Sequence, residues 1–248
     1  MHSVRLLVAV ATALLVALPL TGRSGLPLDG GATASTGALA HAAPKVGVRH
    51  ADFGGTQPSG DARHIADWIA DSADNGSLDF VVVDKRGAAV YVFGSDASLR
   101  AWSPVLLGSA LGDTSAPGIG ERPLSQILPA ERTTPAGRFM GERGRNARDE
   151  DVVWVDYDAA VSMHRVLTTN PAERRLERLA TPSVEDNRIS FGCINVPVAF
   201  YEMHIRPLFA KTRALIYVLP DELTPQQVFG SYNVPVAPAS GRLASALP

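Results

Sequence analysis

The segment Asn187–Val196, with the sequence NRISFGCINV, contains the only cysteine of this 248-residue chain. Cys193 follows Gly192, and glycine lets the backbone turn closely enough to present the next side chain at a site. Cysteine reacts as its thiolate, so a nucleophilic Cys193 needs a nearby base or positive charge that lowers its pKa. A buried cysteine that packs as a small hydrophobic side chain is the alternative, and the cysteine count leaves both open.

Histidine is the usual base beside a reactive thiol, and the chain has six. His164 ends the β-like run AVSMH, and strand ends of a rigid scaffold can hold catalytic groups. A histidine at a solvent-exposed strand edge is the competing interpretation, and position alone favours it. His204 lies on a predicted helix, where it is expected to pack or to face water. Local spacing predicts no metal site, because the sequence has no paired cysteines and no His-x-x-x-His.

The N-terminus has the pattern of an export signal. Arg5 provides a short positive region and Leu6–Leu20 form an apolar run of 15 residues. A bilayer span needs about 20 residues, so the run predicts a signal peptide with a cleavage site near Ala38–Ala40, and an uncleaved anchor is the alternative. The protein is therefore predicted to be periplasmic or secreted. Exported domains usually pair their cysteines, so a single one indicates an intermolecular bridge or a reactive thiol.

Composition excludes some classes of partner. The chain is 46% hydrophobic and 19% charged, with a net charge of −2, and both signs are scattered along it. This pattern predicts neither nucleic-acid binding nor electrostatic adhesion to a membrane. Membrane association is expected only if the N-terminal segment stays uncleaved.

Hydrophobic patterning predicts a mainly β domain with a few helices and a mixed or antiparallel sheet. Residues 1–40 are interpreted as the signal, 41–76 as a linker with a short helix, 77–220 as the catalytic domain and 221–248 as a tail. The helix is expected at Ala62–Ala73, with Ile65, Trp68 and Ile69 on its apolar face. Two half-buried strands, FVVVD and AAVYVF, are expected to form a hairpin, and further strands are expected at RAWSPVLLG, GRFMGE, VVWVDYD, AVSMH and ALIYVLP.

Two more helices are predicted in the second half of the domain. One spans NPAERRLERLA, with Pro171 in its first turn and Leu176 and Leu179 on its apolar side. The other follows the cysteine in PVAFYEMHIRPLFA, and Pro207 is expected to end it. The first of these helices lies between the histidine and the cysteine.

Four segments together resemble the L,D-transpeptidases, the family of the YkuD-type catalytic domain. ISFGCIN (Ile189–Asn195) resembles the family signature at Ser190, Gly192, Cys193, Ile194 and Asn195. SMHRV resembles the segment with the strand-end histidine, TTPAGRF resembles a T-P-x-G-x-F segment, and FVVVDKRGAAVYVF resembles the opening hairpin. The four occur in the family's order between about residues 77 and 220. The resemblance implies a YkuD-like fold, a β-sandwich or mixed sheet.

The same resemblance implies a chemistry. Cys193 would attack a peptidoglycan tetrapeptide stem and release its terminal D-alanine, and His164 would transfer the proton. The backbone N–H groups of Gly192 and Cys193 would hold the oxyanion, and Ser190 would orient His164. The thioester would pass to an amine of another stem, giving a 3→3 cross-link, or to another amine. Donor and acceptor stem peptides are the implied partners, and no cofactor or metal is required.

The sequence departs from the family in three places. Phe191 stands where the family usually has histidine, Arg165 stands where many members have glycine, and residues 165–189 are longer than usual. Phe191 and Arg165 are therefore candidates for contact with substrate. Asn195, which matches the family, is expected to shape the turn or to contact substrate. Two alternatives stay open: a hydrolase on the same scaffold, motivated by the inserted helix, and a non-catalytic wall-binding protein, motivated by Phe191.

Overall fold

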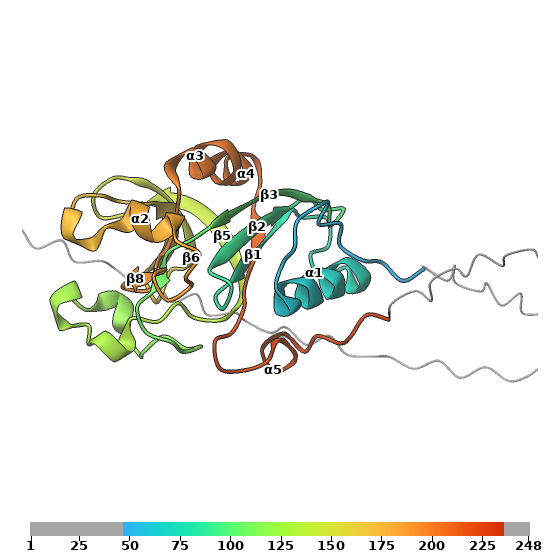
Figure 1. Ribbon diagram of the computed structural model, residues 1–248, viewed down its shortest axis with the longest axis horizontal. Coiled ribbons are helices and arrows are strands. Elements are labelled where there is room, and N and C mark those ends of the chain that lie inside the picture. The colour runs from blue at the N-terminus through green and yellow to red at the C-terminus, as the bar shows by residue number, and fades with distance from the viewer. Residues whose placement is uncertain (1–46, 236–248) are drawn as a thin grey trace, which may run out of the picture. The chain divides into compact units, whose positions relative to one another are not determined.

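An eight-stranded mixed sheet organises residues 47–235, the part of the chain that the computed structural model describes (Figure 1). The predicted signal or anchor and the start of the linker lie outside the described residues. The strand order is β3-β2-β1-β10-β5-β6-β7-β9; β1 and β10 pair in parallel, as do β7 and β9. The strands are β1 Phe80–Asp84, β2 Ala89–Phe93, β3 Leu99–Pro104, β5 Gly137–Arg145, β6 Asp151–Asp156, β7 Val161–Arg165, β9 Ile194–Val196 and β10 Ala214–Val218. The predicted fold class is confirmed.

The long strand β5 joins two halves of the sheet. Its first half, residues 137–141, pairs with β10, and its second half, residues 142–145, pairs with β6. Buried valines of β1 and β2 share one hydrophobic core with Val153 of β6 and Met163 of β7. The two halves therefore pack against each other across this core, as in a sandwich. A separate parallel pair, β4 Leu107–Gly108 and β8 Arg188–Ser190, lies beside them.

Helix α1, Gly60–Ser72, forms where the apolar pattern predicts a helix, and its Ile65, Trp68 and Ile69 are buried. They pack on the outer face of β1, β2 and β10, opposite the sandwich core (Figure 1). The expectation that the β1–β2 hairpin is half-buried is wrong, because every residue of both strands is buried. A half-buried strand has one solvent-exposed face. Here α1 covers the face that would otherwise be exposed to solvent.

The two later helices differ in detail from the prediction. After a 3₁₀ turn at Pro171–Glu173, α2 covers Arg175–Ala180; Leu179 is buried, but Leu176 is 58% exposed. Pro207 does not end the second helix: α3 (Val198–Phe200) continues through a π-helical turn, Tyr201–Ile205, into α4 (Arg206–Lys211). The wide turn fits a proline, which offers no N–H to the preceding turn.

The remaining elements are short. Three 3₁₀ turns cover Ile119–Glu121, Leu124–Gln126 and Pro129–Glu131, and α5 covers Pro225–Phe229. Among residues 47–235, no helix has the length and apolar character that a bilayer crossing requires.

A buried charge cluster holds the segment that precedes Cys193. The Nζ atom of Lys85, a fully buried residue, lies 3.0 Å from Asp113 Oδ1 and 3.1 Å from Asp221 Oδ2. Arg188 at the start of β8 donates to Asp221 Oδ1 at 2.6 Å and to the Lys85 carbonyl at 2.8 Å. Residue 221, where a tail was predicted to begin, is thus packed inside the domain. The cluster fixes β8, and through it the start of the cysteine turn.

Candidate functional site

Cys193 lies in a tight turn between β8 and β9. Gly192 has φ 131°, and a Cβ there would lie 2.7 Å from the Thr133 carbonyl oxygen, so only glycine fits. Thr134 braces the same turn: its hydroxyl donates to the Gly192 carbonyl at 2.8 Å and accepts from the Gly108 N–H at 2.9 Å. The cysteine is therefore presented by backbone that is fixed on both sides.

His164 is positioned by the pairing of β7 with β9. The register places His164 opposite Asn195. His164 Nδ1 lies 2.7 Å from the Arg165 carbonyl oxygen, and Nε2 lies 3.2 Å from Asn195 Nδ2. Because a carbonyl oxygen only accepts, Nδ1 carries a hydrogen in this arrangement. Both ring nitrogens are thus held, and the imidazole has a defined orientation.

The environment of Cys193 favours the thiolate. Its Sγ lies 3.7 Å from Ser162 Oγ and 3.8 Å from the Ala160 carbonyl oxygen. Burial raises the pKa of the Cys193 thiol, but the interaction with His164 outweighs it and brings this pKa below its ordinary value. Burial likewise lowers the pKa of His164, and Cys193 outweighs it so that this pKa is raised. Both shifts act in the direction of the thiolate–imidazolium pair, and the thiolate is the form in which cysteine acts as a nucleophile.

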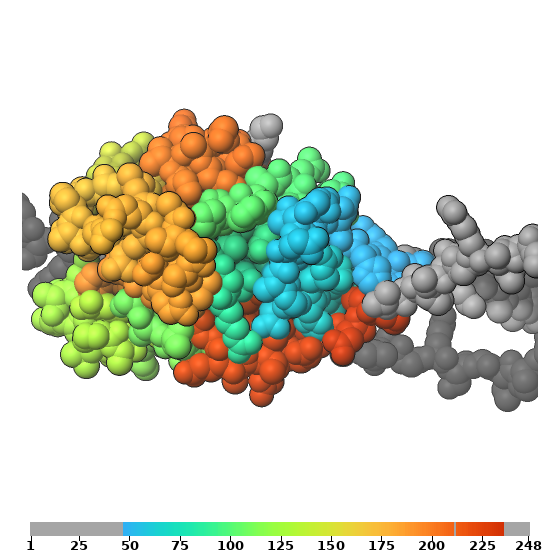
Figure 2. All heavy atoms as spheres, viewed as in Figure 1, coloured from blue at the N-terminus to red at the C-terminus, as the bar shows by residue number. Residues whose placement is uncertain are grey.

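The thiol opens into a cavity of about 260 Å³ between the cysteine turn and the insertion. Figure 2 shows the insertion (yellow-orange) beside the segment near residue 124 (yellow-green) on one face of the protein. The residues around the cavity come from both segments and from the strands: Leu124, Arg148, His164, Leu167, Thr169, Asn170, Glu173, Arg175, Ser190, Phe191, Cys193 and Asn195. The predicted insertion is therefore part of the candidate site.

A larger cavity, about 690 Å³, lies near the thiol and is lined by Ala160, whose carbonyl oxygen contacts Sγ. Trp154 and Tyr157 also line it, with their rings edge to face at a centroid distance of 5.2 Å. Ala160 thus both contacts the thiol and borders this larger cavity.

In the described structure, residues 47–235, neither the hydroxyl nor the carbonyl of Ser190 is hydrogen-bonded to His164, so the predicted orienting bond is not formed. Its hydroxyl donates to the Cys193 carbonyl at 2.7 Å and accepts from the Gly192 N–H at 3.1 Å, and its carbonyl accepts from Ser109 N–H. Ser190 therefore shapes the turn. It also occupies the Gly192 N–H, one of the two predicted oxyanion donors. The Cys193 N–H has no hydrogen-bond partner among residues 47–235 and stays available.

Of the three candidates for substrate contact, only Phe191 faces the cavity without being tied to the catalytic groups. The Arg132 guanidinium stacks on its ring, 4.1 Å from the centroid. Asn195 is fully buried and holds His164 instead. The Arg165 side chain pairs with Glu202 and stacks over Tyr201, and only its carbonyl serves the site.

Three residues that contribute to the site were missed by sequence reasoning. Ser162 lies two positions before His164 on β7, so strand alternation could have placed both on one face. Thr134 belongs to the TTPAGRF segment, but its link to Gly192 depends on the tertiary fold. Arg175 lies in the predicted helix NPAERRLERLA, and no local signal connects it to Asn195, to which it donates a hydrogen bond.

Comparison with known proteins gives similarity to solved structures only, since no family model and no curated sequence matches the chain. The Enterococcus faecium L,D-transpeptidase C442S mutant has 15% identity and a TM-score of 0.31, over 57% of this chain and 50% of that one. The helical cell shape determining protein Pgp2 from Campylobacter jejuni has 15% identity and a TM-score of 0.40, over 63% and 55%. LdtMt1 with imipenem has 16% identity and a TM-score of 0.33, over 57% and 59%.

This chain thus spans between half and three fifths of the length of those structures. Identities and TM-scores this low do not identify a function, so the functional assignment depends on the residues of the site.

Proposed function

We propose that this protein is a cysteine-dependent L,D-transpeptidase that acts on peptidoglycan tetrapeptide stems. One observation carries the proposal: the thiol of Cys193 and the imidazole of His164 open into one cavity, and each shifts the pKa of the other toward the charged pair. A cysteine that merely packs would not be expected beside a base that lowers its pKa. The four sequence segments that resemble the family supply the substrate class.

In the proposed reaction, Sγ of Cys193 attacks the carbonyl carbon between the third residue of the stem and the terminal D-alanine. His164 Nε2 receives the thiol proton, and the Cys193 N–H donates to the oxyanion. The C–N bond then breaks, His164 returns the proton to the leaving amine, and D-alanine departs. The thioester is finally attacked by an amine of a second stem, whose proton goes to His164, and the thiol is restored.

A transferase needs space for two substrates, and we assign the cavity lined by Cys193 to one and the larger cavity bordered by Ala160 to the other. The stem that forms the thioester occupies the cavity beneath the insertion, where Arg148 and Arg175 offer positive charge to its carboxylates. The second stem approaches from the side of Ala160, Trp154 and Tyr157. Action on peptidoglycan places the protein outside the cytoplasm, as the predicted export signal does.

A hydrolase on the same scaffold is the second candidate, and the insertion is the observation that favours it. Thr169, Asn170, Glu173 and Arg175 narrow the cavity from one side. A narrowed site can exclude a bulky amine and admit water to the thioester, which would give a carboxypeptidase.

The test is mass spectrometry of the purified full-length chain incubated with disaccharide-tetrapeptides that carry either diaminopimelate or lysine at the third position. We expect cross-linked dimer with loss of one D-alanine, and none from the Cys193→Ala variant. Trimmed monomer alone would assign the hydrolase. Unchanged substrates of both kinds, with a folded protein, would overturn both proposals and favour a wall-binding protein.

A further inference from the structure

A line of three hydrogen bonds connects the insertion to the base. Arg175 Nη1 donates to Asn195 Oδ1 at 2.5 Å, Asn195 Nδ2 lies 3.2 Å from His164 Nε2, and His164 Nδ1 lies 2.7 Å from the Arg165 carbonyl oxygen. The line crosses from α2 to β9 and β7. It therefore ties a helix that the family resemblance does not account for to the proposed general base.

The two ends of this line, the Arg175 guanidinium and the Arg165 carbonyl, determine which group donates in each hydrogen bond between them. A guanidinium can only donate, so the oxygen of the Asn195 amide must face Arg175 and its NH₂ group must face His164. Nε2 must then accept, and Nδ1 must donate to the Arg165 carbonyl, which can only accept. The arrangement is consistent for a neutral imidazole with its hydrogen on Nδ1. An imidazolium would place an Nε2–H against the NH₂ of Asn195, donor against donor.

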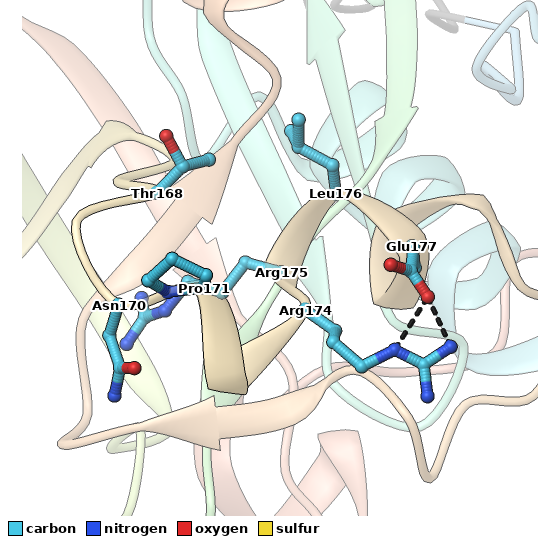
Figure 3. A pocket seen from close by; sticks show the side chains of 7 residues that line it. All are labelled: Thr168, Asn170, Pro171, Arg174, Arg175, Leu176 and Glu177. Carbon is cyan, nitrogen blue, oxygen red and sulfur yellow. Dashed lines mark hydrogen bonds and ion pairs between the residues drawn. The ribbon is translucent and has the colours of Figure 1, made fainter.

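The parts of the line are held in place. Asn195 is fully buried in β9, so water cannot take over either end of its amide. The Arg175 side chain is only 13% exposed, and Glu173 binds its Nε. Arg178, one turn later, donates to the Glu173 carbonyl at 2.8 Å. In Figure 3 the Arg175 side chain runs back beneath Pro171, whereas Arg174 lies outside and pairs with Glu177.

We infer that Arg175 is a positioning residue that fixes the Asn195 amide and thereby holds His164 as the neutral, Nδ1-protonated imidazole in the resting site. This inference builds on the proposed role of His164 as general base. Transfer of the thiol proton to Nε2 requires the Asn195 amide to give up its hydrogen bond, and Arg175 prevents the amide from turning its oxygen to Nε2. The insertion thus restrains the conversion of the Cys193–His164 pair to thiolate and imidazolium.

Other charged or titratable groups act on the same pair. Cys193 and Glu150 raise the pKa of His164 against burial. Those that line the two cavities beside the ring are Arg148, Glu150, Asp151, Arg165, Glu173, Arg175 and Cys193. Removal of Arg175 takes away one cation, which by charge alone disfavours the thiolate and slows its reaction. Release of the amide has the opposite effect, because an Asn195 oxygen turned to Nε2–H stabilises the imidazolium and with it the thiolate.

The experiment measures alkylation of Cys193 by iodoacetamide across pH in the full-length chain. In the Arg175→Met variant we expect alkylation about fivefold faster than wild type near pH 6, the factor that one net hydrogen bond is worth. Arg175→Lys keeps a group that only donates and should restore the wild-type rate. Arg174→Met is the matched control and should leave the rate unchanged. Slower or unchanged alkylation in Arg175→Met would overturn the inference.

A second measurement does not depend on reactivity or charge. In wild-type protein with ¹⁵N-labelled side chains, nitrogen chemical shifts should place the hydrogen of neutral His164 on Nδ1. A coupling through the hydrogen bond from Asn195 Nδ2–H to Nε2 should appear, persist in Arg175→Lys and vanish in Arg175→Met. A hydrogen on Nε2 in the wild type would overturn the inference even if a variant fails to fold. Neither measurement uses a peptidoglycan substrate, so failure of the proposed function is seen separately.

Discussion

The cavity beside Cys193 has a strand side, formed by β7, β9 and the cysteine turn, and an insertion side, formed by the part of the 165–189 insertion that lies between β7 and β8. The strand side is held by backbone pairing: the β7–β9 register sets His164 opposite Asn195, and Thr134 binds the turn. The insertion side is held by side-chain pairs such as Arg175 with Glu173 and Arg174 with Glu177. Backbone pairing of buried strands is rigid, whereas partly exposed ion pairs contribute little to stability. We therefore assign the proposed reaction to the strand side, and the adjustment of its reactivity to the insertion side.

The largest effect is expected from a substitution of His164, on the strand side. His164→Gln removes the proposed base and is expected to lower the turnover of the stem peptide about 10²–10⁴-fold. The pH profile gives the sign: burial raises the pKa of Cys193 and His164 lowers it, so loss of His164 leaves burial opposed only by the hydrogen bonds of Ser162 and shifts alkylation to higher pH. Iodoacetamide kinetics over pH measure this shift. An unchanged profile would show that the thiol owes nothing to His164.

A smaller effect is expected from the brace of the turn. Thr134→Val keeps the shape of the side chain but leaves the Gly108 N–H and the Gly192 carbonyl without their partner. Each buried unsatisfied group costs about 1–3 kcal/mol. The free energy of unfolding should therefore fall by at least the cost of one such group, and denaturant titration measures this fall. Thr133→Val is the matched control, because Thr133 Oγ1 only donates to the Thr114 carbonyl, and it should cost less. Equal losses would contradict the assignment of Thr134 as the brace.

The smallest effect is expected on the insertion side. Glu173→Gln weakens one of the two contacts of Arg175, a pair whose partners are 13% and 29% exposed. Such a pair is worth at most about 1 kcal/mol. The rate of Cys193 alkylation should therefore increase less in Glu173→Gln than in Arg175→Met. Glu177→Gln breaks the outer pair with Arg174 and should change nothing. A larger effect from Glu177 than from Glu173 would reverse the view of which pair serves the site.

The fold class could be predicted from the sequence because apolar runs of strand length are a local signal. Cys193 and His164 were singled out as the candidate pair by the resemblance of ISFGCIN and SMHRV to family segments, because their positions alone left other interpretations open. The partners of that pair were not predictable in the same way. Asn195 was expected to shape the turn or to contact substrate, but the parallel pairing of β7 with β9 buries it against His164. The outward direction of Arg165 could have been found, since alternation puts it on the face opposite Ser162 and His164.

The buried cluster around Lys85 was invisible to sequence reading, because it joins residues 85, 113, 188 and 221 that no motif connects. Full burial of the β1–β2 hairpin was missed for a related reason. The element that covers the second face of a strand can be distant in the chain, and composition does not identify that element.

The pairing of β1 with β10 has a consequence for the order in which the chain can fold. Phe80 is opposite Leu215, and Lys85 needs the carboxylate of Asp221, so the first strand waits for residues made about 135 positions later. Contacts this distant in sequence form slowly, because the intervening loop must close first. The central strands therefore cannot complete their sheet before residues 214–221 have been made. Cys193 and His164 both precede these residues in the chain, so the segments of the candidate site are made before the sheet that supports them is complete.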